Sequence, residues 1–320
     1  MIAQQGVGRL AHSWVAFWDR REAPTCLALT RILMGMVVLS DFLIGKLRGA
    51  VPALWSAAPM GMGVTQDPAS WLARPSLPLG LWALGVIAAF LFMVGALHRA
   101  SGGLLTFVLV VLPSLQPTGD GVDLLVRLVV PILALSGASA CWSVDAWVGR
   151  RRAKPPAAQV PAWPRYLLML QLLWVYSSSA QCRDDASWWP WGGFSAIGHV
   201  LEDPHFARFS PALMTPFYPL TQLATIATMV FELGAPVMLL WTLREPLRQS
   251  QITGLARKLP WIWIVLGASL HLGIALTMTI GIFPFAMLAL YPVLFHPSQV
   301  ATLFSAPRRS VPSWRKNPRK

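Results

Sequence analysis

Long apolar segments recur along this chain, and they limit its fold more than any other feature. A helix that crosses the hydrocarbon core of a bilayer, about 30 Å thick, needs roughly 20 apolar residues. Segments of this kind lie at 27–45, 78–97, 102–118, 122–140, 164–181, 218–242, 260–281 and 282–297, the last being short. They predict an all-α, polytopic transmembrane helix bundle with about eight spans.

The composition supports a membrane protein and excludes several other classes. Hydrophobic residues make up 55% of the 320 residues, and charged residues make up 12%. Soluble domains carry about 25% charged residues, so an ordinary soluble enzyme is excluded, as are disordered and collagen-like chains. The three cysteines are widely spaced, with no CxxC or Cys/His cluster, so we expect no metal site.

The positions of the basic residues predict the orientation of the bundle. With the N-terminus inside, 19 of the 26 Lys and Arg residues fall in inner segments and 5 in outer ones. Membrane proteins place Lys and Arg on cytoplasmic loops, so we expect both termini in the cytoplasm and the protein in the plasma membrane (a bacterial inner membrane). The net charge of +13 then reflects topology, and no nucleic-acid partner is expected.

This orientation gives the expected domain organisation. Residues 1–26 form a cytoplasmic N-terminal segment, residues 27–297 form the transmembrane domain, and residues 298–320 form a basic cytoplasmic tail. No cleavage pattern follows the first apolar segment, so that segment is expected to remain as the first span.

Charged side chains within the apolar segments are functional candidates, because an unpaired charge in a bilayer is costly. At about 1.5 Å of rise per residue, Asp41 and Arg127 lie at the same level, about 21 Å from the inner boundary. We expect a structural ion pair between them. Arg31 lies near the inner end of its segment, where a long side chain is expected to extend to the membrane surface.

Glu232 and His271 form a second expected pair, because they lie at similar depths on the sixth and seventh segments. A carboxylate beside an imidazole can relay protons or hold a polar head group. It can equally serve as a buried hydrogen-bonded pair that locks two helices together. The sequence leaves both interpretations open.

Polar side chains also line the outer end of the fifth segment. Tyr176, Ser179 and Arg183 share one face of a helix that continues to residue 183, with Gln171 deeper on the same helix. A tryptophan-rich stretch at 188–191 follows. It is typical of the aromatic belt at a membrane–water boundary, whereas the polar residues that lead down from it indicate a site.

Several motifs in this order resemble the HTTM (horizontally transferred transmembrane) family, which includes the vitamin K-dependent gamma-carboxylase. The resemblance covers roughly residues 12–296. The motifs are Leu29-Thr-Arg31-Ile-Leu-Met-Gly35, Gly119-Asp120-Gly-Val-Asp123 with Arg127, Trp142-Ser143-Val144-Asp145, Gln171 with Tyr176, Trp189-Pro-Trp-Gly192, Phe231-Glu232-Leu-Gly-Ala-Pro236, and His271 followed by Gly281-Ile-Phe283.

In the carboxylase branch, the resemblance implies a lysine base just before the Trp-x-x-Gly element, acting with reduced vitamin K. This chain has Arg183 or Asp184 at that place and no lysine between Lys154 and Lys258. Arginine cannot act as a base near neutral pH. The resemblance therefore supports the fold and an outward-facing site, and it argues against glutamate carboxylation.

Two functions follow from these observations. The first is a membrane enzyme or maturation factor at the outer membrane face, with a quinone-like isoprenoid or lipid as cofactor and a membrane protein or secreted peptide as partner. The second is a non-catalytic scaffold or subunit of a membrane complex. In the first, His271, Glu232 and Arg183 are the candidate catalytic residues, and the candidate cofactor-binding residues are Tyr176, Trp189 and Gln171.

Overall fold

The computed structural model describes residues 12, 14–47, 76–114, 121–248 and 255–304, and this part of the chain is mostly helical. Two short strands, β1 (Arg21–Glu22) and β2 (Val160–Pro161), pair antiparallel. The expected all-α class is confirmed at this level. Most of the expected basic tail, from residue 305 onward, lies outside the described residues, as does the start of the N-terminal segment, up to residue 11.

Each of the eight apolar segments overlaps a helix. These helices are α2 (Thr25–Leu47), α4 (Ser76–Val94), α5 (His98–Ser114), α6 (Gly121–Leu135), α8 (Trp163–Gln181), α11 (Tyr218–Arg248), α12 (Leu255–Thr277) and α13 (Phe283–Leu290). The shorter elements between and after them are α7 (Val144–Arg151), α9 (Ala196–Glu202), α10 (Pro211–Met214), α14 (Pro297–Phe304) and the 3-10 turns η2 (Ala186–Trp188), η3 (Pro190–Gly192), η4 (Thr215–Phe217) and η5 (Tyr291–Leu294).

The two helices that end furthest before their predicted bounds, α6 and α13, each do so for a local reason. The segment 122–140 stops being helical after Leu135, because the Ser136 hydroxyl donates to the carbonyl of Leu133 and accepts from the amide of Ala138. The segment 282–297 changes from α13 to the turn η5, where Pro292 has no N–H to continue the helix.

Three of the helices are long and apolar enough to cross a membrane: Thr25–Ile44, Pro211–Thr242 and Lys258–Thr277. The apolar stretches Leu79–Val94, His98–Leu112 and Phe283–Leu294 have at most 17 residues. At about 1.5 Å per residue they reach at most about 26 Å, short of the hydrocarbon core. The membrane character is therefore supported by the structure, whereas the number of spans and their orientation stay predictions.

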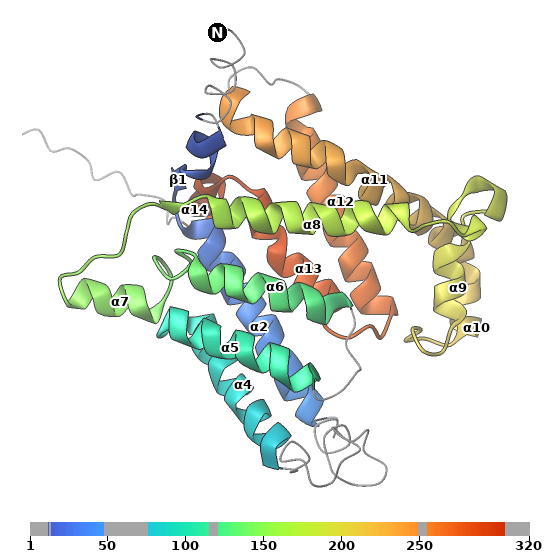
Figure 1. The fold of residues 1–320 in the computed structure, drawn as a ribbon. Coiled ribbons are helices and arrows are strands. Elements are labelled where there is room, and N and C mark those ends of the chain that lie inside the picture. Colours follow the sequence, from blue (N-terminus) through green and yellow to red (C-terminus); the bar gives the residue numbers. More distant parts are fainter. Residues whose placement is uncertain (1–11, 13, 48–75, 115–120, 249–254, 305–320) are drawn as a thin grey trace, which may run out of the picture.

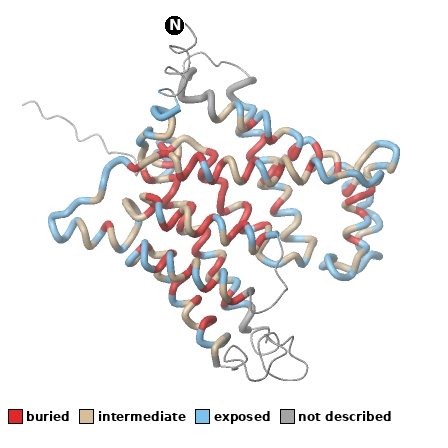
Figure 2. The backbone as a smooth tube through the Cα atoms, viewed as in Figure 1, coloured by how far each residue is buried: buried red, intermediate tan, exposed pale blue. Residues whose placement is uncertain are grey.

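The helices form a bundle with two structurally different ends (Figure 1). α7 and the β1–β2 pair lie at one end, where α2 and α8 begin, and α9 and α10 lie at the opposite end. We refer to these as the α7 end and the α9 end. α2 packs against α4, α6 and α13, while α8 packs against α11. Buried residues concentrate where these helices meet in the middle of the molecule (Figure 2).

Arg31 does not extend to the membrane surface as expected, because its side chain is fully buried. Nη1 donates to the carbonyl oxygens of Phe92 and Met93, at 2.9 and 2.5 Å. Nε donates to Ala138 at 3.2 Å and Nη2 to Trp142 at 2.6 Å. The last carbonyls of a helix lack partners within it and form the negative end of its dipole. The end of α4 and the loop after α6 therefore hold this cation in place of a carboxylate.

Gly95 makes this arrangement possible. It has φ = +68°, and a Cβ atom at this position would lie 2.6 Å from Nη1 of Arg31. The left-handed conformation and the close approach both require glycine. The chain can thus turn from α4 into α5 directly over the guanidinium.

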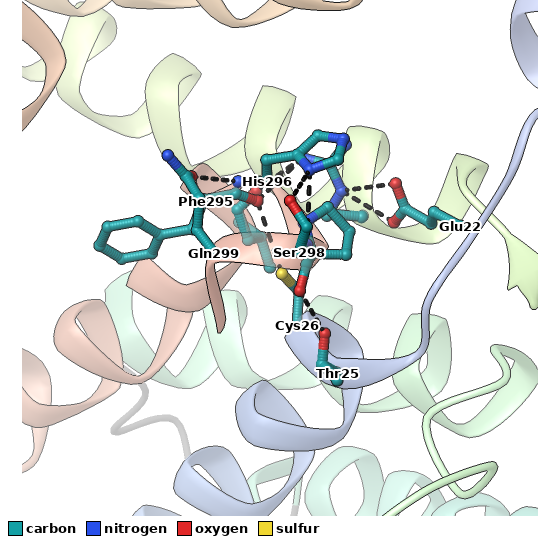
Figure 3. A network of polar contacts seen from close by, with 10 residues as sticks. Glu22, Thr25, Cys26, Phe295, His296, Ser298 and Gln299 are labelled. Atoms are coloured by element: carbon teal, nitrogen blue, oxygen red, sulfur yellow. Dashed lines mark hydrogen bonds and ion pairs between the residues drawn. The ribbon is translucent and has the colours of Figure 1, made fainter. Parts of the chain in front are cut away.

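A second buried arginine belongs to a network of polar contacts at the α7 end. The network includes Glu22, Thr25 and Cys26 (Figure 3). Nε of Arg165, at the start of α8, donates to both carboxylate oxygens of Glu22, at 2.8 and 3.0 Å, and Nη1 donates to the carbonyl of Val293 at 3.1 Å. The Thr25 hydroxyl donates to the carbonyl of Pro297 at 2.8 Å. The start of α2, the start of α8 and the segment from η5 to α14 are therefore joined by polar contacts.

We predict that Arg31→Met destabilises the protein far more than Arg99→Met. The first change leaves buried carbonyls without their donor, and each such group costs about 1–3 kcal/mol. Arg99 is exposed at the second residue of α5, so its removal should change stability by less than about 0.5 kcal/mol. Thermal unfolding of the purified protein in detergent measures both, and equal unfolding temperatures would contradict a structural role for Arg31.

Candidate functional site

Two groups of polar side chains meet along the second half of α8, toward the α9 end. The first, which we call the ion-pair cluster, contains Ser179 and Arg183 with Glu232 of α11 and Trp188 of η2. The second, the tyrosine–histidine cluster, contains Tyr176 of α8, His271 of α12 and Tyr291 of η5. Tyr176 and Ser179 lie one turn apart on α8. The helix ends at Gln181, so Arg183 lies just beyond it, and its side chain reaches Ser179 and Glu232 from there.

Arg183 and Glu232 form a two-pronged ion pair. Nη2 lies 2.7 Å from Oε1 and Nε lies 3.1 Å from Oε2. The Ser179 hydroxyl donates a further hydrogen bond to Oε1 at 3.0 Å. The side chain of Glu232 is 9% exposed and that of Arg183 is 23% exposed. Parallel bonds of this kind fix the geometry as well as the charge, so the carboxylate is held as an acceptor for Arg183 and Ser179.

Tryptophan side chains contact Arg183 of this ion pair on the side of the α9 end. Cζ of Arg183 lies 3.6 Å from the centroid of the Trp188 ring, a cation–π contact. The indole N–H of Trp189 donates to the carbonyl of Arg183 at 2.9 Å, and its ring stacks on Trp191 with centroids 5.5 Å apart. Trp189, a candidate cofactor-binding residue, therefore positions the backbone of Arg183 in this structure.

The turn that carries these tryptophans is itself fixed locally. Asp185 caps η2 by accepting from the hydroxyl and the amide of Ser187. These hydrogen bonds, the hydroxyl first, lower the pKa of the Asp185 carboxyl, because they favour its ionised form. The turn is thereby held in one conformation above Arg183.

The tyrosine–histidine cluster lies deeper and is closed to solvent. The Tyr176 hydroxyl lies 2.7 Å from Nε2 of His271 and 3.2 Å from the hydroxyl of Tyr291. The three residues are only 4–6% exposed. Nδ1 of His271 is buried and has no hydrogen-bond partner among the described residues. A buried polar atom without a partner is uncommon in folded proteins and calls for a structural or functional explanation.

Aromatic rings surround this cluster, and a glycine lets them approach. The ring of Tyr176 packs edge-on against Phe231 and Trp263, and His271 packs against Phe283. A Cβ atom at Gly267 would lie 2.3 Å from both the Tyr291 hydroxyl and the Phe231 ring. Glycine at this position therefore brings α12 close enough to place His271 beside the two tyrosines.

The direct pair expected between Glu232 and His271 is wrong. Glu232 is bound by Ser179 and Arg183, and His271 is bound by Tyr176. Similar depth placed the two residues at one level, but it did not show which way each side chain faces around its helix. Both do belong to the same region between α8, α11 and α12, as two neighbouring clusters.

Tyr291 was not predicted as a site residue. It lies in a segment that was interpreted as a continuous short span, whereas the helix ends just before it and η5 begins there. The dipeptide Tyr291-Pro292 was the available signal, because a proline marks the end of a helix. A tyrosine at that position can face the interior from the end of α13.

The other candidate residues lie elsewhere. Gln171 lies deeper on α8, and its Oε1 atom is buried without a hydrogen-bond partner in the described part of the chain. Asp41 and Arg127 line one small cavity of ≈ 20 Å³ between α2 and α6, together with Asp123. That volume suffices for about one water molecule. The ion pair between Asp41 and Arg127 stays a prediction.

A comparison with protein-family models shows the family to which this chain belongs. The HTTM domain model matches residues 19–298. The chain belongs to the HTTM domain family. No curated protein and no solved structure matches it. The resemblance seen in the sequence motifs is thereby confirmed, and the helices with both clusters lie within the matched part of this HTTM protein.

The chemistry available in this HTTM site follows from its donors and acceptors. Within the described residues, no group of three or more His, Cys, Asp and Glu side chains could hold a metal ion. Glu232 is engaged by Arg183, so its carboxylate is not available as a base in this conformation. The imidazole of His271, joined to two phenols, is the group that can accept or donate a proton.

We predict that the pair Arg183–Glu232 contributes about 2 kcal/mol of coupling energy to stability. Breaking a fully buried ion pair lowers stability by more than this. Arg183 is partly exposed, so solvent screens its interaction with Glu232 and the expected value is smaller. A double-mutant cycle with Arg183→Gln, Glu232→Gln and the double variant measures this coupling in detergent-purified protein.

The exposed pair His205–Asp203 provides the matched control for this cycle. Its side chains are 89% and 42% exposed, so the same cycle there should give a coupling close to zero. A coupling at Arg183–Glu232 as small as that of the control would contradict the structural importance of the pair.

Proposed function

We propose that this HTTM protein is an integral membrane enzyme or maturation factor whose reaction takes place at the tyrosine–histidine cluster, near the outer membrane face, with a quinone- or lipid-like cofactor. The observation that supports this proposal is the hydrogen-bond chain Tyr291–Tyr176–His271, which ends at the unpaired Nδ1 atom. Ionisable groups inside a membrane protein mark functional sites by default.

The donor-to-acceptor direction of the hydrogen bonds from Tyr291 through Tyr176 to His271 defines what the site can bind. When Tyr291 donates to Tyr176 and Tyr176 donates to Nε2 of His271, neutral imidazole carries its proton on Nδ1. That nitrogen is then a buried donor for a carbonyl or similar oxygen of a bound molecule. A change of tautomer moves a proton between the two nitrogens, so the same side chain can deliver or remove a proton.

The surrounding side chains suit an apolar ring that carries oxygen atoms. Phe231, Trp263 and Phe283 supply aromatic surface next to His271 and Tyr176. A quinone-like isoprenoid would supply redox chemistry at this site when bound. Gln171, deeper on α8, offers a second unpaired polar atom, the acceptor Oε1.

The ion-pair cluster has a positioning role in this proposal. Glu232 binds Nε and Nη2 of Arg183, so this edge of the guanidinium is not available to an oxyanion in this conformation. Together with Trp188, the pair instead closes the site on the α9 side and excludes water. Exclusion of water strengthens electrostatic interactions at the deeper cluster.

The alternative is a non-catalytic scaffold or subunit of a membrane complex. The observation that favours it is the complete engagement of Glu232, which is typical of a buried pair that locks two helices. In that case both clusters serve packing, and removing a hydroxyl group changes stability alone.

Two tyrosines of α8 allow a matched test of these alternatives. Tyr176→Phe and Tyr166→Phe each remove the hydroxyl of a buried tyrosine from the same helix, but only the first breaks the hydrogen bond to His271. After gentle extraction of the full chain, mass spectrometry measures bound isoprenoids and lipids. We predict a bound quinone-like isoprenoid in the wild type, and at least a tenfold loss of it in Tyr176→Phe at nearly unchanged unfolding temperature.

The control Tyr166→Phe should retain the bound molecule at wild-type occupancy. Tyr166 stacks on Phe17 at the opposite end of α8, away from the site. Equal occupancy in both variants, or no bound molecule in the wild type, would instead support the scaffold.

The proposed orientation places both termini in the cytoplasm and the α9 end outside, in a plasma membrane. The bias of Lys and Arg toward the segments at the α7 end supports this placement. Cys182 is exposed at the α9 end, whereas Cys141 is partly buried at the α7 end and Cys26 is buried. Burial raises the pKa of the Cys141 thiol to about 11, which keeps it protonated and slow to react.

We therefore predict that a membrane-impermeant maleimide labels Cys182 in intact cells. Labelling should disappear in Cys182→Ser. Cys141 should react only after permeabilisation, and faster as the pH rises toward 11, because its thiolate becomes populated there. Labelling of Cys182 that requires permeabilisation would reverse the proposed orientation.

A further inference from the structure

Helix α7 projects from the bundle at the α7 end and is covered by other elements only near its start (Figure 1). Its surface combines two kinds of exposed side chains within a short stretch. The exposed apolar residues are Trp142, Val144 and Trp147, and the exposed cations are Arg150, Arg151, Arg152 and Lys154. Seven residues of these two kinds within 142–154 form the surface that we call the α7 platform.

The start of α7 is fixed rigidly to the rest of the molecule. The Ser143 hydroxyl accepts from the amide of Ala146 at 2.9 Å and caps the helix. The Asp145 carboxylate accepts from the amides of Leu97 and His98, both at 2.9 Å, and so also caps α5. The amide of Asp145 donates to the carbonyl of Gly95 at 3.0 Å.

The anchoring continues directly into the buried core. The carbonyl of Trp142 accepts from Nη2 of Arg31 at 2.6 Å. A basic loop of ordinary composition would be free to move, because nothing holds its backbone. Here the platform is held on one side by Arg31 and on the other by the amides at the start of α5.

The side chains of α7 are arranged in one stripe along the helix. Val144, Trp147 and Arg151 follow i, i+3, i+7 spacing and therefore share a face. Cζ of Arg151 lies 4.0 Å from the centroid of the Trp147 ring. An indole with a guanidinium stacked on it suits the boundary between acyl chains and phosphate groups, where indole rings are favoured.

We propose that the α7 platform is a preorganised binding site for the phosphate headgroup of an anionic phospholipid at the membrane surface. Trp142, Val144 and Trp147 lie at the acyl boundary, and the four cations between 150 and 154 bind the phosphate. Charge complementarity selects an anionic lipid over a zwitterionic one. The clamp formed by Asp145 holds the cations at a fixed height relative to the bundle.

Purified full-length protein in detergent micelles tests this with two added lipids, dioleoyl phosphatidylglycerol and dioleoyl phosphatidylcholine. Native mass spectrometry measures lipid retention, and the unfolding temperature measures the stabilisation that a bound lipid gives. We expect phosphatidylglycerol to be retained and phosphatidylcholine to be lost. Equal retention of the two lipids would overturn the proposal.

Two double variants separate this site from a general effect of positive charge. Arg150→Gln with Arg151→Gln removes two platform cations, and each is expected to lower the apparent affinity for phosphatidylglycerol about fivefold. Arg21→Gln with Lys258→Gln removes two exposed cations outside α7 and should leave the affinity unchanged. The same loss in both variants would overturn the proposal.

Asp145→Asn separates the effect of the clamp from the effect of charge, because the two predict opposite changes in the affinity for phosphatidylglycerol. This change makes the region more positive, so simple electrostatic attraction predicts tighter binding of phosphatidylglycerol. The proposal predicts weaker binding, because the carboxylate that holds the start of α7 on α5 is lost. Unchanged or tighter binding, in protein whose lipid-free unfolding temperature shows it to be folded, would overturn the role of the clamp.

Soluble anions distinguish a lipid site from a phosphate site. Inorganic phosphate and glycerol phosphate, at the same concentration as the lipid, are expected to give no stabilisation, because they lack the acyl chains that contact Trp142 and Trp147. Stabilisation by these anions equal to that by phosphatidylglycerol would identify a site for soluble anions and overturn the lipid assignment.

Discussion

A polar group buried in apolar surroundings must find its partner within the protein, and the structure of this HTTM protein depends on that constraint. The buried Arg31 and Arg165 and the partly exposed Arg183 meet it in three ways. The first is held by backbone carbonyls alone, the second by a carboxylate and carbonyls, and the third by a carboxylate under an indole ring. Each arginine joins segments that are distant in sequence, so the cost of burying these cations is offset by contacts that define the tertiary fold.

The two ends of the bundle use these contacts differently. At the α7 end, the network around Glu22 and Arg165 joins the start of α2, the start of α8 and the segment from η5 to α14. At the α9 end, Arg183 and Glu232 join the end of α8 to α11. In the deeper hydrogen-bond chain Tyr291–Tyr176–His271, Nδ1 of His271 has no partner among the described residues. The unpaired nitrogen on which the proposed function rests therefore lies away from the densely linked α7 end.

Positions along the helices were predictable from the sequence, but directions around them were not. Apolar segments identified the helices because hydrophobicity over about 20 residues is a property of the sequence alone. The rise per residue predicted similar depths for Glu232 and His271, but their partners Arg183 and Tyr176 depend on the rotation of α11 and α12, which packing sets. The burial of Arg31 was not predictable for a related reason. Its acceptors are backbone carbonyls of α4 and of the loop after α6, and every residue type has a backbone carbonyl.

The cage around Arg31 also bears on how the protein is made. Its acceptors Ala138 and Trp142 lie 107 and 111 residues further along the chain. During synthesis, Arg31 leaves the ribosome before the segment that carries these two carbonyls. The full set of acceptors around its guanidinium is therefore complete only after the chain has been made beyond residue 142.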